Sequence, residues 1–135
     1  MIRTLSDRAA AFSLFQRTFH SSENSYFNKA WRTQDCALGL WHDGSLIGMA
    51  IVCGTKLEYI SIDPDVQGKG FGSHLLQHML SIYPTLYLNP ADDPVLCRWY
   101  ERNGFTLSSQ IVGSPHTSRC YVRHRYPTRS KMCKI

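Results

Sequence analysis

The sequence predicts an α+β protein in which a single-layer mixed β-sheet is flanked by helices. Short apolar runs of strand length alternate along the chain with longer segments whose apolar residues recur at helical spacing. Because helices and strands are interleaved from end to end, one mixed sheet with helices on its faces is the architecture they favour. The chain has 135 residues, of which 43% are apolar and 19% charged, as in an ordinary globular protein. We therefore expect a single domain over residues 1–135.

The first half of the chain predicts a strand, two helices and a β-hairpin. Asp7 is a typical N-cap for a helix with an apolar stripe that includes Leu14 and Phe15. The Asp43-Gly44 pair is typical of a tight hairpin turn. The predicted elements are a strand at 2–5, a helix that begins after residue 7, a short helix at 26–31, and strands at 37–41 and 46–52.

The second half predicts two strands and two helices, followed by two more strands. Pro64 ends a strand, Pro84 ends an amphipathic helix, and Asp93-Pro94 is a strong helix start. Gly104 provides the left-handed residue with which the last helix ends. The predicted elements are strands at 57–62 and 86–88, helices at 73–83 and 94–103, and strands at 105–111 and 119–126.

A glycine-rich turn stands between a predicted strand and a predicted helix. Gly68, Gly70 and Gly72 would let the backbone turn tightly and let a ligand approach it closely, and Lys69 adds a cation. A helix that starts here offers unpaired N–H groups and a dipole that favours anions. Alternating glycines can equally form a purely structural turn. The spacing fits neither a dinucleotide fingerprint nor a P-loop, because Ser73 stands where the former needs a third glycine.

The stretch from Leu57 to Leu76 closely resembles the central motif of the GNAT superfamily of acyl-CoA-dependent N-acyltransferases. Gln67, Gly70 and Gly72 match its core pattern [QR]-x-x-G-x-[GA]. A second family segment, Y-x-x-x-G-F, is matched from Tyr100 to Phe105. The resemblance implies the GNAT fold and acetyl-CoA as co-substrate. It also implies that the strand before the turn pairs with the pantetheine arm, that amides of the turn hold the pyrophosphate, and that Gln67 supports the turn.

The cofactor contacts that this resemblance implies lie in two short segments. They are Ile60, Ser61 and Ile62 on the strand, and Gln67, Gly68, Lys69, Gly70, Phe71, Gly72 and Ser73 in the turn. Many relatives carry an asparagine seven residues before the tyrosine, where this chain has Asp93. An aspartate accepts hydrogen bonds but cannot donate them, so a helix N-cap is the simpler role for Asp93.

Two residues are candidates for proton transfer. Tyr100 matches the family tyrosine that is usually assigned as the general acid for the departing thiolate; the alternative is a packed aromatic residue beside Trp99. Glu58 is the candidate general base, because related enzymes often carry an acid on this strand. Alternation places Glu58 on the same face as Ile62 unless a bulge intervenes; the alternative is a solvent-facing charge.

Other residue types give weaker signals. His74 and His78 are one helical turn apart, but no third ligand is near in sequence, so we expect no metal. The five cysteines form no C-x-x-C pair, which favours buried thiols in a reducing compartment. The chain shows no signal-peptide core and no apolar run long enough to cross a membrane. We expect a cytoplasmic monomer or homodimer without membrane contact.

The sequence therefore predicts an N-acetyltransferase that moves an acetyl group from acetyl-CoA to a primary amine by direct attack in a ternary complex. The acceptor class stays open between a small amine, a protein N-terminus, a lysine and aminoacyl-tRNA. An alternative is a basic module that contacts nucleic acid, or a tRNA-directed acetyltransferase, built on the same fold. Its basis is the net charge of +5 and a late run of basic and aromatic residues: Arg119, Tyr121, Arg123, Arg125, Tyr126 and Arg129.

Overall fold

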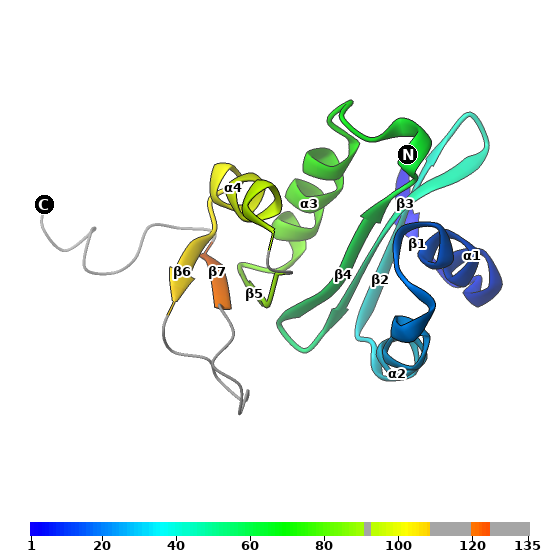
Figure 1. Ribbon diagram of the computed structural model, residues 1–135, viewed down its shortest axis with the longest axis horizontal. Coiled ribbons are helices and arrows are strands. Elements are labelled where there is room, and N and C mark those ends of the chain that lie inside the picture. Colours follow the sequence, from blue (N-terminus) through cyan, green and yellow to red (C-terminus); the bar gives the residue numbers. More distant parts are fainter. Residues whose placement is uncertain (91–92, 109–119, 125–135) are drawn as a thin grey trace, which may run out of the picture. The chain divides into compact units, whose positions relative to one another are not determined.

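The structure of the protein is a computed structural model that describes residues 1–90, 93–108 and 120–124 (Figure 1). The chain forms two compact units, residues 1–79 and 80–135, and we describe each unit separately. No helix in the described ranges is both long and apolar enough to cross a membrane.

The first unit contains four strands, two short 3₁₀ helices and three α-helices, the third of which runs on past residue 79. Strands β1 to β4 form an antiparallel sheet in chain order, β1-β2-β3-β4. The elements are β1 (Ile2–Thr4), α1 (Arg8–Thr18), η1 (Ser21–Glu23), α2 (Asn24–Thr33), β2 (Cys36–His42), β3 (Ser45–Cys53), β4 (Lys56–Ile62), η2 (Pro64–Val66) and α3 (Phe71–Ile82).

Local sequence signals account for the ends of these elements. Asp7 accepts a hydrogen bond from the backbone N–H of Ala10 at 3.1 Å, which confirms it as the N-cap of α1. Asp43 and Gly44 both have positive φ, at 50° and 79°, and form the two-residue turn between β2 and β3. Helix α3 begins at Phe71, two residues earlier than predicted, because the backbone N–H of His74 already donates to the carbonyl oxygen of Gly70.

An aromatic cluster holds α1 and α2 against the sheet. Figure 1 shows α1 and α2 on one face of β1–β4 and α3 on the other. The rings of Phe15 and Phe27 lie 4.7 Å apart and are fully buried with Met49 and Ile51 of β3. Tyr59 of β4 packs edge-on against Phe15, at 5.1 Å between ring centroids. Strand β4 is thus fixed to α1 by side-chain packing as well as to β3 by its hydrogen bonds.

Among its described residues, the second unit contains three strands and one helix, in addition to the last turn of α3. The strands pair antiparallel in the order β5-β7-β6. Asp93 caps α4 by accepting from the backbone N–H of Val95 at 2.9 Å, and Gly104 follows the helix with φ of 93°, both as predicted. The predicted strands at 105–111 and 119–126 extend beyond the described residues. The elements are β5 (Thr85–Leu88), α4 (Pro94–Arg102), β6 (Thr106–Ser108) and β7 (Cys120–His124).

Candidate functional site

The glycine-rich turn has a backbone that only glycine adopts easily. Gly68 and Gly70 have φ of 80° and 88°, in the left-handed region that disfavours residues with a Cβ. A Cβ built at either glycine would have no heavy atom of the described residues within 4 Å. Both positions therefore border open space on the surface of the turn, and a ligand can approach the backbone there without meeting a side chain.

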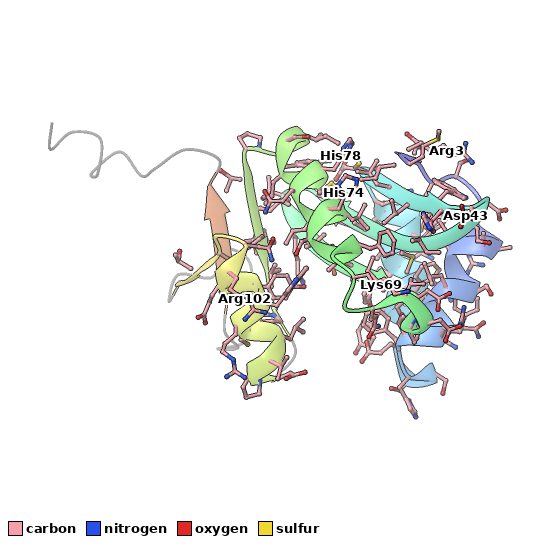
Figure 2. The ribbon with its side chains drawn as sticks, turned by 90° about the horizontal axis from the view of Figure 1, so that it is seen from above. Arg3, Asp43, Lys69, His74, His78 and Arg102 are labelled. Carbon is pink, nitrogen blue, oxygen red and sulfur yellow. The ribbon has the colours of Figure 1, made fainter. Side chains whose placement is uncertain are left out.

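The turn leads directly into the N-terminus of α3. The first helical hydrogen bond runs from the N–H of His74 to the carbonyl oxygen of Gly70, at 3.0 Å. The amides of Phe71 and Gly72 come before it and have no acceptor within the helix. Lys69 lies in the loop that enters the helix (Figure 2). This end of α3 offers backbone donors, the positive end of the helix dipole and one cation, a combination that suits phosphate groups.

The entry to the turn is tied to the end of β4. The side-chain amide of Gln67 donates to the carbonyl oxygen of Ile62 at 3.0 Å. The backbone N–H of Asp63 donates to the carbonyl oxygen of Ile47 on β3 at 2.7 Å. At Gly48, a Cβ would lie 2.7 Å from the Cδ1 atom of Ile62, so a larger residue there would force the Ile62 side chain to shift. These contacts fix the position of the turn relative to the sheet.

A β-bulge changes the face on which Glu58 lies. Val52 pairs with Leu57 and Ile51 pairs with Tyr59, so Glu58 is an extra residue without a partner on β3. The strand alternation that would place Glu58 beside Ile62 is broken at this point, so the exception that the prediction named, an intervening bulge, applies. The Glu58 carboxylate pairs with Lys56, which lies opposite Cys53 of β3, and Cys53 packs against the core under α1 and α2. The Glu58 carboxylate therefore lies toward the helix α1–α2 face.

Polar groups gather around this part of β4. The Glu58 carboxylate pairs with the Lys56 ammonium, with 3.4 Å between Oε1 and Nζ, and both side chains are about a quarter exposed. Burial, followed by the charges of Glu23 and Glu58, raises the pKa of Tyr59 to about 12. The hydroxyl of Ser61 is buried and has no hydrogen-bond partner among the described residues. An unpaired buried hydroxyl is costly to the folded state.

Tyr100 lies in the second unit, on α4. It is 6% exposed and packs edge-on against Trp99 and Phe105, with ring centroids 4.9 and 5.5 Å away. Burial raises the pKa of the Tyr100 phenol well above its usual value, with a smaller contribution from Cys97. The phenol therefore keeps its proton at neutral pH and can donate it. The turn and Glu58 lie in the first unit.

The ion pairs of one residue near the turn could not be predicted from the sequence. Arg17, in the last turn of α1, forms ion pairs with Asp63 and Asp65, and its Nη2 atom lies 3.0 Å from the Asp65 carboxylate. The partners are 46 and 48 residues away in sequence, so no local motif predicts the contacts. Only the packing of α1 beside β4 brings these residues together.

The remaining candidates do not assemble into a site. His74 and His78 follow one another along α3, and the described ranges hold no group of three or more side chains that could bind a metal (Figure 2). Cys36, Cys53 and Cys97 are thiols outside any disulfide. The basic and aromatic run that suggested nucleic-acid binding lies outside the described residues, apart from β7, whose backbone alone is described.

Comparison with known proteins agrees with this geometry. Residues 33–107 match the family model described as "Acetyltransferase (GNAT) domain". The peptidyl-lysine N-acetyltransferase YjaB of Salmonella typhimurium strain LT2 is 29% identical over 75 residues, which cover 52% of each chain. The chain therefore spans about half the length of this curated relative.

Solved structures resemble nearly the whole chain. The PaiA N-acetyltransferase of Thermoplasma acidophilum, determined in complex with coenzyme A, has a TM-score of 0.70 at 16% identity, over 92% of this chain and 98% of that one. The ribosomal-protein-S18-alanine N-acetyltransferase of Escherichia coli has a TM-score of 0.66 at 23% identity, over 90% of both chains. The chain belongs to the GNAT acetyltransferase family, and the predicted α+β fold with a sheet flanked by helices is confirmed.

Proposed function

We propose that this protein transfers an acetyl group from acetyl-CoA to a primary amine, and that the two substrates are bound together when the amine attacks. The observation that carries the proposal is the turn at Gly68 and Gly70, with positive φ and open space beside both residues at the start of α3. A relative of the same fold binds coenzyme A, which supports the same ligand class here. Acetyl-CoA supplies an acetyl group that is activated as a thioester.

The residues of β4 and the turn fit such a ligand. Amides at the start of α3 and the cation of Lys69 suit the pyrophosphate. The backbone of Ile60 and Ile62 is assigned to the pantetheine arm, and the unpaired hydroxyl of Ser61 lies on the same strand. Gln67 acts indirectly, because its hydrogen bond to Ile62 holds the turn against the strand. The full set of proposed contacts is Ile60, Ser61, Ile62, Gln67, Gly68, Lys69, Gly70, Phe71, Gly72 and Ser73.

Glu58 is the proposed general base. A lysine-like amine is neutral in about one molecule in 2,500 at pH 7, a deficit of roughly 4.6 kcal/mol that a base removes by accepting the ammonium proton. The bulge turns the Glu58 carboxylate toward the α1–α2 face, beside Lys56 and Tyr59. We infer that the amine reaches the thioester from this face, with Glu58 accepting its proton directly or through a water.

Tyr100 is the proposed general acid. When the nitrogen–carbon bond forms and the carbon–sulfur bond breaks, the departing thiolate needs a proton, and a buried phenol is protonated at every pH at which the enzyme would work. A covalent route through a cysteine is less suitable, because burial raises the pKa of the Cys53 thiol and so weakens it as a nucleophile.

The acceptor is proposed as an amine carried by a peptide or protein. The printed names of two relatives specify peptidyl lysine and the alanine of a ribosomal protein. The two carboxylates near Tyr59, those of Glu23 and Glu58, would attract a cationic amine. We place the reaction in the cytoplasm, because a thiol such as Cys53 stays reduced there.

A product assay tests this function. Purified protein is incubated with acetyl-CoA and, in separate reactions, a lysine-containing peptide with a blocked N-terminus, an unblocked alanine-initiated peptide without lysine, and a small diamine. Thiol release and the mass of each acceptor are followed together. We expect stoichiometric thiol release and acetylation of at least one acceptor. If acetyl-CoA binds but no amine is acetylated, the protein is a CoA-binding module and the proposed chemistry is wrong.

A further inference from the structure

Arg17 joins α1 to two carboxylates that stand just before the glycine-rich turn. Its two terminal nitrogens contact different residues, one the carboxylate of Asp63 and the other that of Asp65. The Asp63 side chain is only 13% exposed, whereas that of Asp65 is 79% exposed. One guanidinium thus partly neutralises a mostly buried and an exposed negative charge at the same time.

The backbone that carries these carboxylates is held in place just before the turn. The backbone N–H of Asp63 is held by the carbonyl oxygen of Ile47, and its Oδ1 atom accepts from the backbone N–H of Asp65 at 2.9 Å. The carbonyl oxygen of Asp63 also accepts from the N–H of Val66. The segment is therefore fixed by its backbone within a few residues of Gly68. Two negative charges on a fixed backbone close in sequence to a phosphate-binding turn would repel an anionic ligand.

We propose that Arg17 is a positioning residue whose ion pairs with Asp63 and Asp65 screen the phosphate groups of CoA from these carboxylates. The inference rests on the proposed function, because it concerns the same turn. Arg17 acts through the two aspartates and does not itself contact the acetyl group or the amine. Its guanidinium bridges both side chains at once, which a single ammonium does less well.

Replacing Arg17 with an uncharged residue should weaken CoA binding, because the carboxylates of Asp63 and Asp65 lose the cation that they pair with. We expect Arg17→Met to raise the Kd of CoA about three- to tenfold at low salt, since the two carboxylates are then unscreened, and less at high salt, where ions screen them. Arg17→Lys should recover much of the affinity. The binding of acetyl-pantetheine, which lacks the phosphates, should not change. Arg32→Met removes an equal charge from an exposed position on α2 and should leave CoA binding as in the wild type.

Asp65→Asn separates this role from a purely structural one. If Arg17 only tied α1 to the turn, Asp65→Asn would remove one tie and weaken CoA binding. If Arg17 screens charge, Asp65→Asn should tighten CoA binding about twofold and should restore most of the affinity lost in Arg17→Met. Asp65 suits this test because its backbone, not its side chain, bonds to Asp63.

Isothermal titration of CoA into the wild type and these variants, at low and high salt, decides the matter. Unchanged affinity in Arg17→Met, or weaker binding in Asp65→Asn, would overturn the inference while leaving the proposed function intact. A wild type that does not bind CoA would overturn both. If Arg17→Met does not fold, Asp65→Asn in the wild-type background still gives opposite predictions for the two roles.

Discussion

The side-chain amide of Gln67 donates a hydrogen bond to the carbonyl oxygen of Ile62, 3.0 Å away, across the entry to the glycine-rich turn. Ile62 is the last residue of β4, and the turn begins within a few residues of it. The contact therefore joins the strand proposed to hold the pantetheine arm to the backbone proposed to hold the pyrophosphate. A change in this one bond should alter how well the two parts of the ligand are bound together.

Gln67→Met keeps the length of the side chain but removes the donor. The carbonyl oxygen of Ile62 then lacks a partner, which costs about 1–3 kcal/mol of stability if water cannot replace it. We expect a lower melting temperature and a Kd for CoA raised about fivefold. Gln16→Met, at an exposed position on α1, is the control and should change neither quantity. CoA affinity equal to that of the wild type would show that Gln67 does not support the site.

Glu58→Gln removes the proposed base and keeps the shape of the side chain. We expect kcat/KM for the amine to fall about 100-fold or more at neutral pH, and to fall less as pH rises, because more of the amine is then already neutral. The matched variant is Lys56→Met, which breaks the ion pair with Glu58 but leaves its carboxylate in place. It should retain most of the activity. A loss in Glu58→Gln that is the same at every pH would contradict the role of base.

Tyr100→Phe removes one hydroxyl from a buried ring. The edge-on contacts with Trp99 and Phe105 involve the ring and should survive, so the melting temperature should change little. General acid catalysis is worth about 100- to 10,000-fold, and we expect kcat to fall at least tenfold with CoA binding nearly unchanged. Tyr87→Phe on β5 is the matched control. An unchanged kcat in Tyr100→Phe would falsify the role of acid, once viscosity measurements on the wild type have excluded rate-limiting product release.

Local chemistry made most of the fold predictable from the sequence. Asp7 and Asp93 cap helices, Asp43-Gly44 closes a hairpin and Gly104 ends α4, each through contacts within a few residues along the chain. The turn was predictable for the same reason, because Gly68 and Gly70 adopt positive φ angles that few other residues adopt. The start of α3 was placed too late, since glycine is a poor helix former and hid a first turn that contains Gly72.

The features that could not be predicted depend on partners distant in sequence. The bulge at Glu58 appears only when β4 is paired with β3, because strand register is set between strands and not within one. The ion pairs of Arg17 need α1 to lie beside the segment that follows β4. The raised pKa of Tyr59 likewise depends first on burial and then on the charge of Glu23, and both arise only when α1 and α2 pack against β4.

The central claim is that CoA binds at the backbone of the glycine-rich turn, and a pair of matched glycine variants tests it most directly. Gly70 and Gly54 both have positive φ, 88° and 62°, and at neither would a Cβ meet another atom within 4 Å. Valine at either position should cost about 1–2 kcal/mol through backbone strain. Only at Gly70 would the side chain also occupy the space assigned to the ligand.

Calorimetric titration of CoA into Gly70→Val and Gly54→Val therefore separates strain from binding. We expect both variants to fold with similarly lowered melting temperatures, Gly54→Val to bind CoA as the wild type does, and Gly70→Val to show no measurable binding. Equal CoA affinity in the two variants would contradict the assignment of the turn as the CoA site.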